Sequence, residues 1–152
     1  MARQLYETEN DKARERGIAN VVEKRWGLEL KKLPISQRLD YACLRRGVVV
    51  GLIEIKYRKF TWGDYPDVML SASKIKFASE MFNAFGIRSS FVVCDQTHVV
   101  KQTPIVESNC SFKLAFGGRT LDARDDQDSE LIVNIPNGYF KTIGYLTTED
   151  WS

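Results

Sequence analysis

The sequence predicts an α/β protein of the mixed (α+β) kind, in which helices flank a mixed central sheet and further β elements follow. Three patterns predict this class. Residues 8–26 place apolar side chains at three- and four-residue intervals, as an amphipathic helix does. Segments 37–45 and 48–58 are apolar and flank a glycine turn, which is typical of an antiparallel hairpin. A second helical pattern at 71–85 leads directly into the apolar segment 89–94, which indicates a β-α-β crossover with parallel strands.

Length and composition indicate one domain over residues 1–152, because no linker or repeat divides the chain. The net charge of +2 is too small to indicate a nucleic-acid partner by itself. Three cysteines without paired spacing predict free thiols, and no N-terminal stretch is apolar enough for a signal peptide or a membrane span. We therefore expect a cytoplasmic protein without a membrane partner.

The first helix, at 8–26, is expected to end at Gly27 and to carry Glu15 on its apolar face. Segment 28–33 follows as a short strand. Pro34 ends that strand, because proline has no amide hydrogen to donate to a neighbouring strand.

The hairpin formed by 37–45 and 48–58 decides which side chains face one another across the sheet. We expect a three-residue loop centred on Gly47, which places Asp40 directly opposite Glu54. A tight two-residue turn would instead shift the pairing by one residue.

The segment after the hairpin, 60–67, is an aromatic loop with Trp62 at its tip. Ser71 is expected to cap the second helix and Gly86 to end it. Lys74 lies at the edge of the apolar face of this helix. The residues expected on its core face are Ile75, Ala78, Phe82 and Phe85.

A C-terminal β extension over about 99–152 is expected beyond the crossover strand, with strands near 111–116 and 131–135. The acidic loop 122–130 between these strands carries five carboxylates. It supports one further interpretation, that of a protein-interaction module whose acidic loop contacts a basic partner.

A charged pair follows the apolar run of the hairpin: Glu54 and Lys56 share one face of the strand, about 7 Å apart. Burying unpaired charge is costly, so the pair indicates a chemical role unless the strand is solvated. Magnesium is typically held by one or two carboxylates with water and phosphate oxygens. Asp40 and Glu54 would supply the carboxylates and the Ile55 carbonyl a third oxygen. Glu15 could reach the same ion or a second one.

Phosphodiester hydrolysis needs an activated water and positive charge around the reacting phosphate. Lys56 would orient the water or neutralise phosphate charge, and Lys74 would add a second positive charge. With the two carboxylates, they form the expected catalytic set. Arg58, Lys59 and Trp62, together with Lys74, are the expected nucleic-acid contacts, Trp62 either stacking on a base or packing as part of a lid.

The order of these residues resembles the PD-(D/E)XK nuclease superfamily: a helix with Glu15, a strand with Asp40, a strand with Glu54-Ile55-Lys56, a helix with Lys74, and then the strand at 91–93. The resemblance covers about residues 9–95. The run Glu54-Ile55-Lys56-Tyr57-Arg58, followed by Lys74, is similar to that of small phage-type and repair-type endonucleases, including restriction-endonuclease-like and Holliday-junction-resolvase-like members.

The resemblance implies a restriction-endonuclease-like α-β-β-β-α-β core with Mg²⁺ as cofactor and Mn²⁺ as its substitute. The function it implies is a metal-dependent endonuclease acting on duplex or branched DNA in a bacterial cell or a phage-infected host, with structure-specific cleavage as one form. A homodimer would allow such an enzyme to cut both strands. The alternative is a catalytically silent nucleic-acid-binding protein with the same fold.

Overall fold

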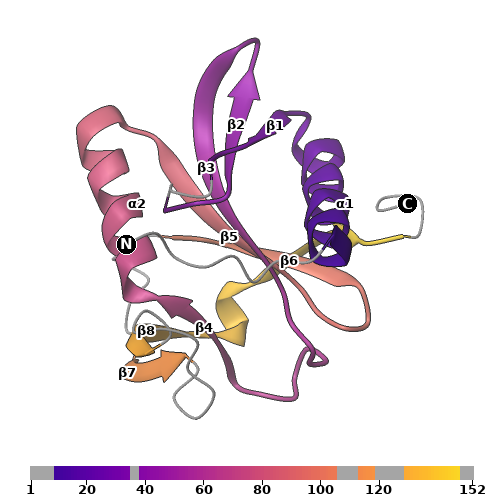
Figure 1. The fold of residues 1–152 in the computed structure, drawn as a ribbon, viewed down its shortest axis with the longest axis vertical. Helices are drawn as coiled ribbons and strands as arrows, with labels where there is room; N and C mark the ends of the chain where they lie inside the picture. Colours follow the sequence, from indigo (N-terminus) through magenta and orange to yellow (C-terminus); the bar gives the residue numbers. More distant parts are fainter. Residues whose placement is uncertain (1–8, 35–37, 106–112, 119–128, 148–152) are drawn as a thin grey trace.

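The protein is described by a computed structural model that covers residues 9–34, 38–105, 113–118 and 129–147 (Figure 1). The elements run in the order α1 (Glu9–Trp26), β1 (Glu29–Lys32), β2 (Tyr41–Arg45), β3 (Val48–Tyr57), β4 (Asp67–Ser71), α2 (Ala72–Phe85), β5 (Arg88–Cys94), β6 (Val99–Pro104), β7 (Lys113–Gly118), β8 (Ser129–Pro136), a 3-10 turn (Asn137–Tyr139) and β9 (Lys141–Tyr145).

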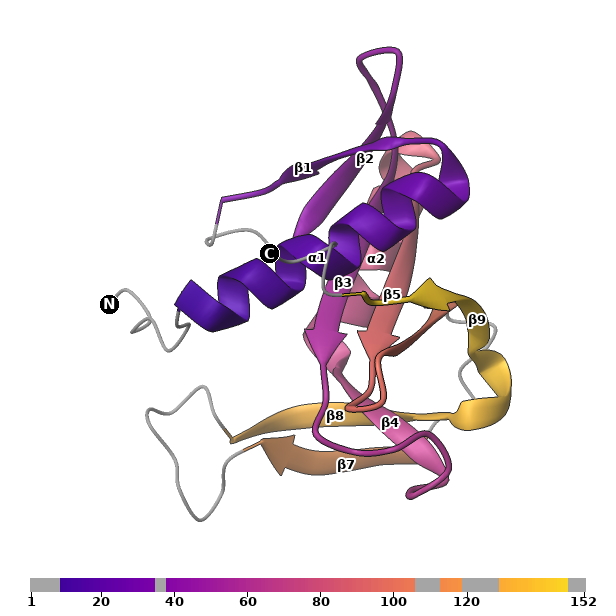
Figure 2. The same cartoon turned by 90° about the vertical axis from the view of Figure 1, so that its right-hand side faces the viewer.

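The strands form two sheets. The larger has the order β1-β2-β3-β5-β6-β9, with β3 and β5 parallel and the other neighbours antiparallel. The smaller has the order β4-β8-β7 and lies beyond the carboxyl ends of β3 and β5 (Figure 2). The mixed sheet expected from the sequence is therefore confirmed, and the β-α-β crossover gives its one parallel pair among the described strands.

The two helices cover opposite faces of the larger sheet (Figure 1). Ile53 and Ile55 of β3 pack with the buried side of α1, where Ile18 is fully buried. Leu52 of the same strand packs in a second cluster with Ile75 of α2. Because side chains alternate along a strand, Glu54 and Lys56 lie on the α2 face. The alternation places the charged pair between the sheet and the second helix.

The second helix begins and ends where the sequence predicts. Ser71 accepts a hydrogen bond from the Ser73 amide (3.3 Å), and Gly86 adopts a left-handed conformation (φ 70°). The expected core face is correct for Ile75 and Ala78, which are buried. It is wrong for Phe82 and Phe85, which are 46% and 69% exposed. Periodicity identifies a helix face but not how much of its length is covered.

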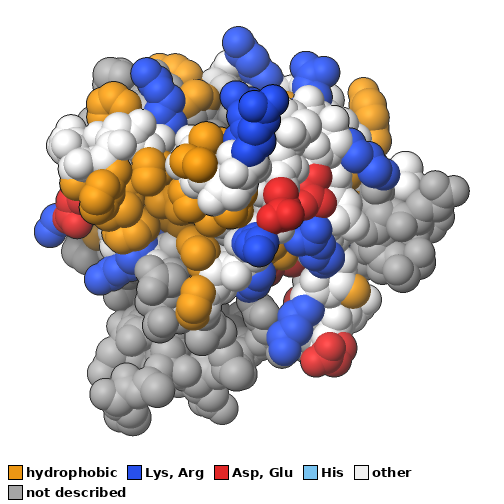
Figure 3. All heavy atoms as spheres, turned by 90° about the horizontal axis from the view of Figure 1, so that it is seen from above, with side chains coloured by type: hydrophobic (Ala, Val, Ile, Leu, Met, Phe, Trp, Pro, Cys, Tyr) orange, Lys and Arg blue, Asp and Glu red, His pale blue; other side chains and the backbone are white. Residues whose placement is uncertain are grey.

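Part of the surface of this protein around α2 is therefore apolar. Seen from above, hydrophobic side chains gather on the α2 side of the molecule, and Lys and Arg side chains are spread around them (Figure 3). Val48, at the start of β3, is also exposed (63%).

The β2–β3 hairpin differs from the expectation in its turn. Arg46 and Gly47 both have positive φ (52° and 79°), and Arg45 pairs with Val48, so that the turn has two residues and not three. The register then shifts by one residue, because Leu44 pairs with Val49 whereas Cys43 pairs with Gly51. The unpaired residue is Val50, a β-bulge. Beyond the bulge, the strands have the register that a three-residue loop would have produced.

Other elements were not anticipated. Strand β4 forms directly before α2, in the region where the sequence indicated the end of an aromatic loop, and it pairs with β8. Strands β6 and β9 extend the larger sheet. The strands expected near 111–116 and 131–135 are present as β7 and β8. The acidic loop 122–130 lies outside the described residues, except for its last two.

Neither of the described helices has the length and apolar character that a membrane crossing requires.

Candidate active site

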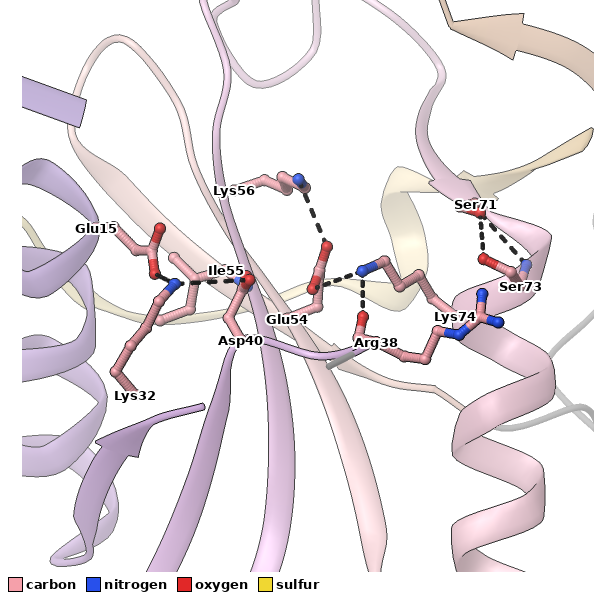
Figure 4. Close-up of polar contacts among 10 residues, drawn as sticks. All are labelled: Glu15, Lys32, Arg38, Asp40, Glu54, Ile55, Lys56, Ser71, Ser73 and Lys74. Atoms are coloured by element: carbon pink, nitrogen blue, oxygen red, sulfur yellow. Dashed lines mark hydrogen bonds and ion pairs between the residues drawn. The ribbon is translucent and has the colours of Figure 1, made fainter. Parts of the chain in front are cut away.

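Glu54 lies at the centre of a charged cluster in the interior of the protein (Figure 4). It is 1% exposed, on the strand that has β2 on one side and β5 on the other. Its Oε2 is 3.5 Å from the Lys56 ammonium, and its Oε1 is 3.6 Å from that of Lys74. The structure thus brings together one buried carboxylate from the middle of the sheet and two lysines from different elements.

This burial governs the protonation of Glu54. The pKa of the carboxyl is raised from 4.5 to about 7: burial is the largest cause and the nearby Asp40 contributes, whereas the ammonium groups of Lys56 and Lys74 oppose the rise. Its Oε1 is buried and has no hydrogen-bond partner. A buried oxygen without a hydrogen-bond partner lowers the stability of the fold. This oxygen is therefore a candidate ligand for a cation.

Asp40 lies immediately before β2, beside the edge of β3. Its amide donates to the Ile53 carbonyl (3.0 Å), and its Oδ2 accepts a hydrogen bond from the Ile55 amide (2.8 Å). Its own carbonyl accepts a hydrogen bond from the Leu33 amide (2.8 Å). These bonds hold the Asp40 carboxylate against the strand that carries Glu54, at the point where regular pairing between β2 and β3 ends.

The backbone of Ile55 faces the same position. In an extended strand the N–H and C=O of one residue point to the same edge, and the Ile55 N–H points to Asp40. The Ile55 carbonyl is therefore directed to the Asp40 edge as well. Two carboxylates and one carbonyl form an oxygen-rich set of the kind that hard divalent cations prefer.

Lys74 enters the cluster from the first turn of α2. Its ammonium donates a hydrogen bond to the Arg38 carbonyl, and its side chain is only 23% exposed. The Ser71 cap determines where the helix begins, and thereby which turn of the helix faces Glu54. Lys56, in contrast, is 39% exposed and extends from the sheet toward solvent.

Glu15 approaches from the other side of the sheet, because it belongs to α1 (Figure 4). Its Oε1 accepts a hydrogen bond from the Lys32 ammonium, which is also 3.9 Å from Asp40 Oδ1. Burial lowers the pKa of Lys32, but the bond to Glu15 and the charges of Asp40 and Glu15 outweigh this effect, so the pKa is raised. Glu15 is thus connected to Asp40 through a lysine.

Lys32 was not among the residues that the sequence singled out. The signal that would have found it is the alternation along β1: Leu30 is buried against α1, and Lys32 lies two residues later on the same face. A lysine on the face that carries an inward glutamate is well placed to pair with it. Lys31, on the opposite face of β1, pairs instead with Glu29 at 3.8 Å.

The residues expected to contact nucleic acid differ in how exposed they are. Arg58 is half-buried just beyond the end of β3, and its pKa is lowered by burial against the opposing effect of the Glu54 charge. Lys59 is exposed. Trp62 donates its indole N–H to the Val99 carbonyl (3.0 Å) and packs against Phe140, with ring centroids 5.3 Å apart.

The same loop is tied to the end of β5 by Asp95, which is fully buried. Its Oδ2 accepts a hydrogen bond from the Trp62 amide (2.9 Å), and its Oδ1 accepts one from the Val99 amide (3.0 Å). Of the two roles considered for Trp62, these contacts correspond to packing. Tyr65 is the exposed aromatic side chain of this loop (61%).

Within the described residues, no three His, Cys, Asp or Glu side chains come close enough to hold a metal ion by themselves. Asp40 and Glu54 would each supply a carboxylate to an ion bound there, and water or substrate oxygens would complete its coordination. Cys94 belongs to no metal site of this kind: it is buried, and burial raises its pKa to about 12.

Comparisons with known proteins concern the family and the fold of this chain. A family model described as "Phage putative PDDEXK endonuclease" matches residues 1–143. The solved structure of Hjc, a Holliday junction resolvase from Archaeoglobus fulgidus, superimposes with a TM-score of 0.53 at 16% sequence identity, covering 87% of this chain and 92% of that one. At this identity the likeness concerns the fold. No curated protein sequence matches significantly. Since the family model spans nearly the whole chain, this protein belongs to the phage PD-(D/E)XK endonuclease family.

Proposed function

We propose that this protein is a metal-dependent endonuclease that hydrolyses phosphodiester bonds in duplex or branched DNA, with Mg²⁺ as its cofactor and Mn²⁺ as a substitute. The observation that carries the proposal is the state of Glu54. Its carboxylate is 1% exposed, one of its oxygens has no hydrogen-bond partner, and its pKa is raised even though two lysines approach it and lower that pKa. A buried carboxylate in this state is better explained by a ligand than by a contribution to stability.

In this proposal, Asp40, Glu54 and the Ile55 carbonyl hold the ion. A bound divalent cation lowers the pKa of water and stabilises negative charge that develops on phosphate. The two carboxylates differ in how they are held: Asp40 is oriented by the Ile55 amide, and Glu54 by its place in the middle of the sheet. Both therefore keep their positions without the ion, so that little reorganisation is needed on binding.

The two lysines have different tasks in the same proposal. Lys56 is the more exposed, so its ammonium can contact the attacking water or the scissile phosphate. Lys74 is fixed by the Arg38 carbonyl, and it provides a positive charge of constant position. Lys59 and Tyr65 are exposed near the end of β3, where they can contact the DNA backbone and bases. Arg58 would add positive charge beneath them.

Three finer points belong to the proposal. Branched DNA is the favoured substrate, supported by the fold shared with a Holliday junction resolvase. Residues 1–152 act as one nuclease domain, and two copies form a homodimer with two-fold symmetry, because paired sites cut both strands. The enzyme acts in the cytoplasm of a bacterial cell or a phage-infected host.

The test is cleavage of supercoiled plasmid, single-stranded DNA and a four-way junction, each with Mg²⁺ or with EDTA. Wild-type protein is expected to cut at least one of them only with Mg²⁺, and Lys56→Ala is expected to lose this activity. Lys76→Ala is the matched control, because Lys76 is an exposed lysine two residues from Lys74 on α2. Cleavage that survives EDTA, or the Lys56 substitution, contradicts the proposal. Binding without any cleavage would favour the silent nucleic-acid-binding protein.

A further inference from the structure

The carboxylates at the candidate site approach from two faces of the larger sheet. Glu54 lies on the α2 face, whereas Glu15 projects from α1, which covers the opposite face (Figure 4). Asp40 lies between them, just before β2. The Lys32 ammonium lies between Glu15 and Asp40, in contact with Glu15 and 3.9 Å from Asp40 Oδ1.

We propose that Lys32 takes the place of a second metal ion, so that the chain binds one divalent cation, at Asp40 and Glu54, while Glu15 acts through Lys32. This inference rests on the proposed metal-dependent function and concerns its stoichiometry. Lys32 and Glu15 are then positioning residues, and neither is a metal ligand.

The charges support this arrangement. Glu15, Asp40 and Glu54 carry three negative charges when ionised, and Lys32 with one divalent ion supplies three positive charges. Lys56 and Lys74 then remain to neutralise the phosphate of a bound nucleic acid. A second divalent ion between Glu15 and Asp40 would have to displace the Lys32 ammonium, which already provides a cation there.

The position of the ammonium is also held by an aromatic ring. The Lys32 Nζ is 5.2 Å from the centroid of Tyr41, whose side chain is buried at 3% exposure. A cation at this distance from a ring is attracted to its face. Because Tyr41 begins β2 and Asp40 directly precedes it, the ring and the carboxylate hold Lys32 at one place beside the metal site.

The test counts the Mn²⁺ ions bound per chain, by titrating the full-length protein with Mn²⁺ and following the electron paramagnetic resonance signal of the free ion. Wild type is expected to bind one ion. Lys32→Met, which keeps the aliphatic stem and removes the charge, is expected to bind two, because the ammonium no longer occupies the space between Glu15 and Asp40. Lys32→Arg should remain at one. Lys31→Met is the matched control on the same strand and should also remain at one, since Lys31 pairs with Glu29 on the other face.

The double substitution Glu15→Gln with Lys32→Met is expected to return the count to one. Two ions in wild type, with one lost in Glu15→Gln, would overturn the inference while leaving a metal-dependent nuclease. A count of one in Lys32→Met would overturn it as well. One ion in wild type and two in Lys32→Met, without cleavage of any DNA, would support the inference and overturn the proposed function.

Discussion

Glu54→Gln should stabilise the metal-free protein at neutral pH while it removes the proposed activity. Burial raises the pKa of Glu54 from 4.5 to about 7. In the unfolded chain the carboxyl loses its proton near its ordinary pKa, whereas in the folded protein it keeps the proton until about pH 7. The folded state therefore becomes less stable, relative to the unfolded state, as pH rises from 4.5 to about 7. Glutamine has no proton to lose and escapes this effect.

The magnitude follows from the same two pKa values. At 1.36 kcal/mol for each pH unit, the interval between 4.5 and about 7 corresponds to about 3 kcal/mol. Glu54→Gln is thus expected to equal wild type in stability near pH 4.5 and to exceed it by about 3 kcal/mol at pH 8. The attraction of Lys56 and Lys74 is already contained in this pKa, because both ammonium groups lower it.

The assay is urea unfolding at pH 5 and pH 8 in EDTA, followed by circular dichroism. Glu80→Gln is the matched control, because Glu80 is exposed on α2 and its substitution should change stability by less than about 0.5 kcal/mol at both pH values. Saturating Mg²⁺ should then narrow the difference between wild type and Glu54→Gln: at one hundred times the dissociation constant it stabilises wild type by about 2.7 kcal/mol, and the variant by less. A Glu54→Gln variant that is less stable than wild type at pH 8 in EDTA would refute the reasoning.

Three further predictions concern the site and the fold. Asp40→Asn should abolish cleavage and keep or strengthen DNA binding in EDTA, since it removes a charge that repels phosphate; a gel-shift assay that shows lost binding would contradict this. The cleavage rate at limiting Mg²⁺ should rise about tenfold per pH unit below pH 7 and level off above it, because Glu54 must lose its proton to bind the ion; a flat profile from pH 5.5 to 8 would count against that role. Gly144→Ala should destabilise the fold by about 1 to 3 kcal/mol in thermal unfolding, because its Cβ would lie 2.6 Å from Val21 Cγ1, and Gly138→Ala, in open space, should not.

Local patterns in the chain sufficed for several features. Ser71 and Gly86 delimit α2 because a hydroxyl cap and a left-handed glycine act on their own neighbours. The common face of Glu54 and Lys56 follows from the two-residue period of a strand. The parallel pairing of β3 with β5 follows from the crossover through α2 that connects them.

The register beside Asp40 was expected for a reason that proved wrong. The turn at Arg46 and Gly47 has two residues, and the bulge at Val50 restores the pairing that a three-residue loop would have produced. No local pattern marks Val50 as a bulge, because its position depends on where the two strands must match to bury their side chains. The registration of Tyr41 with Ile53, next to Asp40, is the result.

Local patterns establish which side chains share a face of each helix and strand, since the periods of these elements are properties of the backbone. Which of those faces meet depends on long-range packing. It placed Glu15 and Glu54 on opposite sides of the sheet, set Lys32 between Glu15 and Asp40, and left Phe85 exposed. It also buried Glu54 and thereby raised its pKa to about 7, because desolvation depends on everything packed around a carboxyl group and not on its neighbours in the chain.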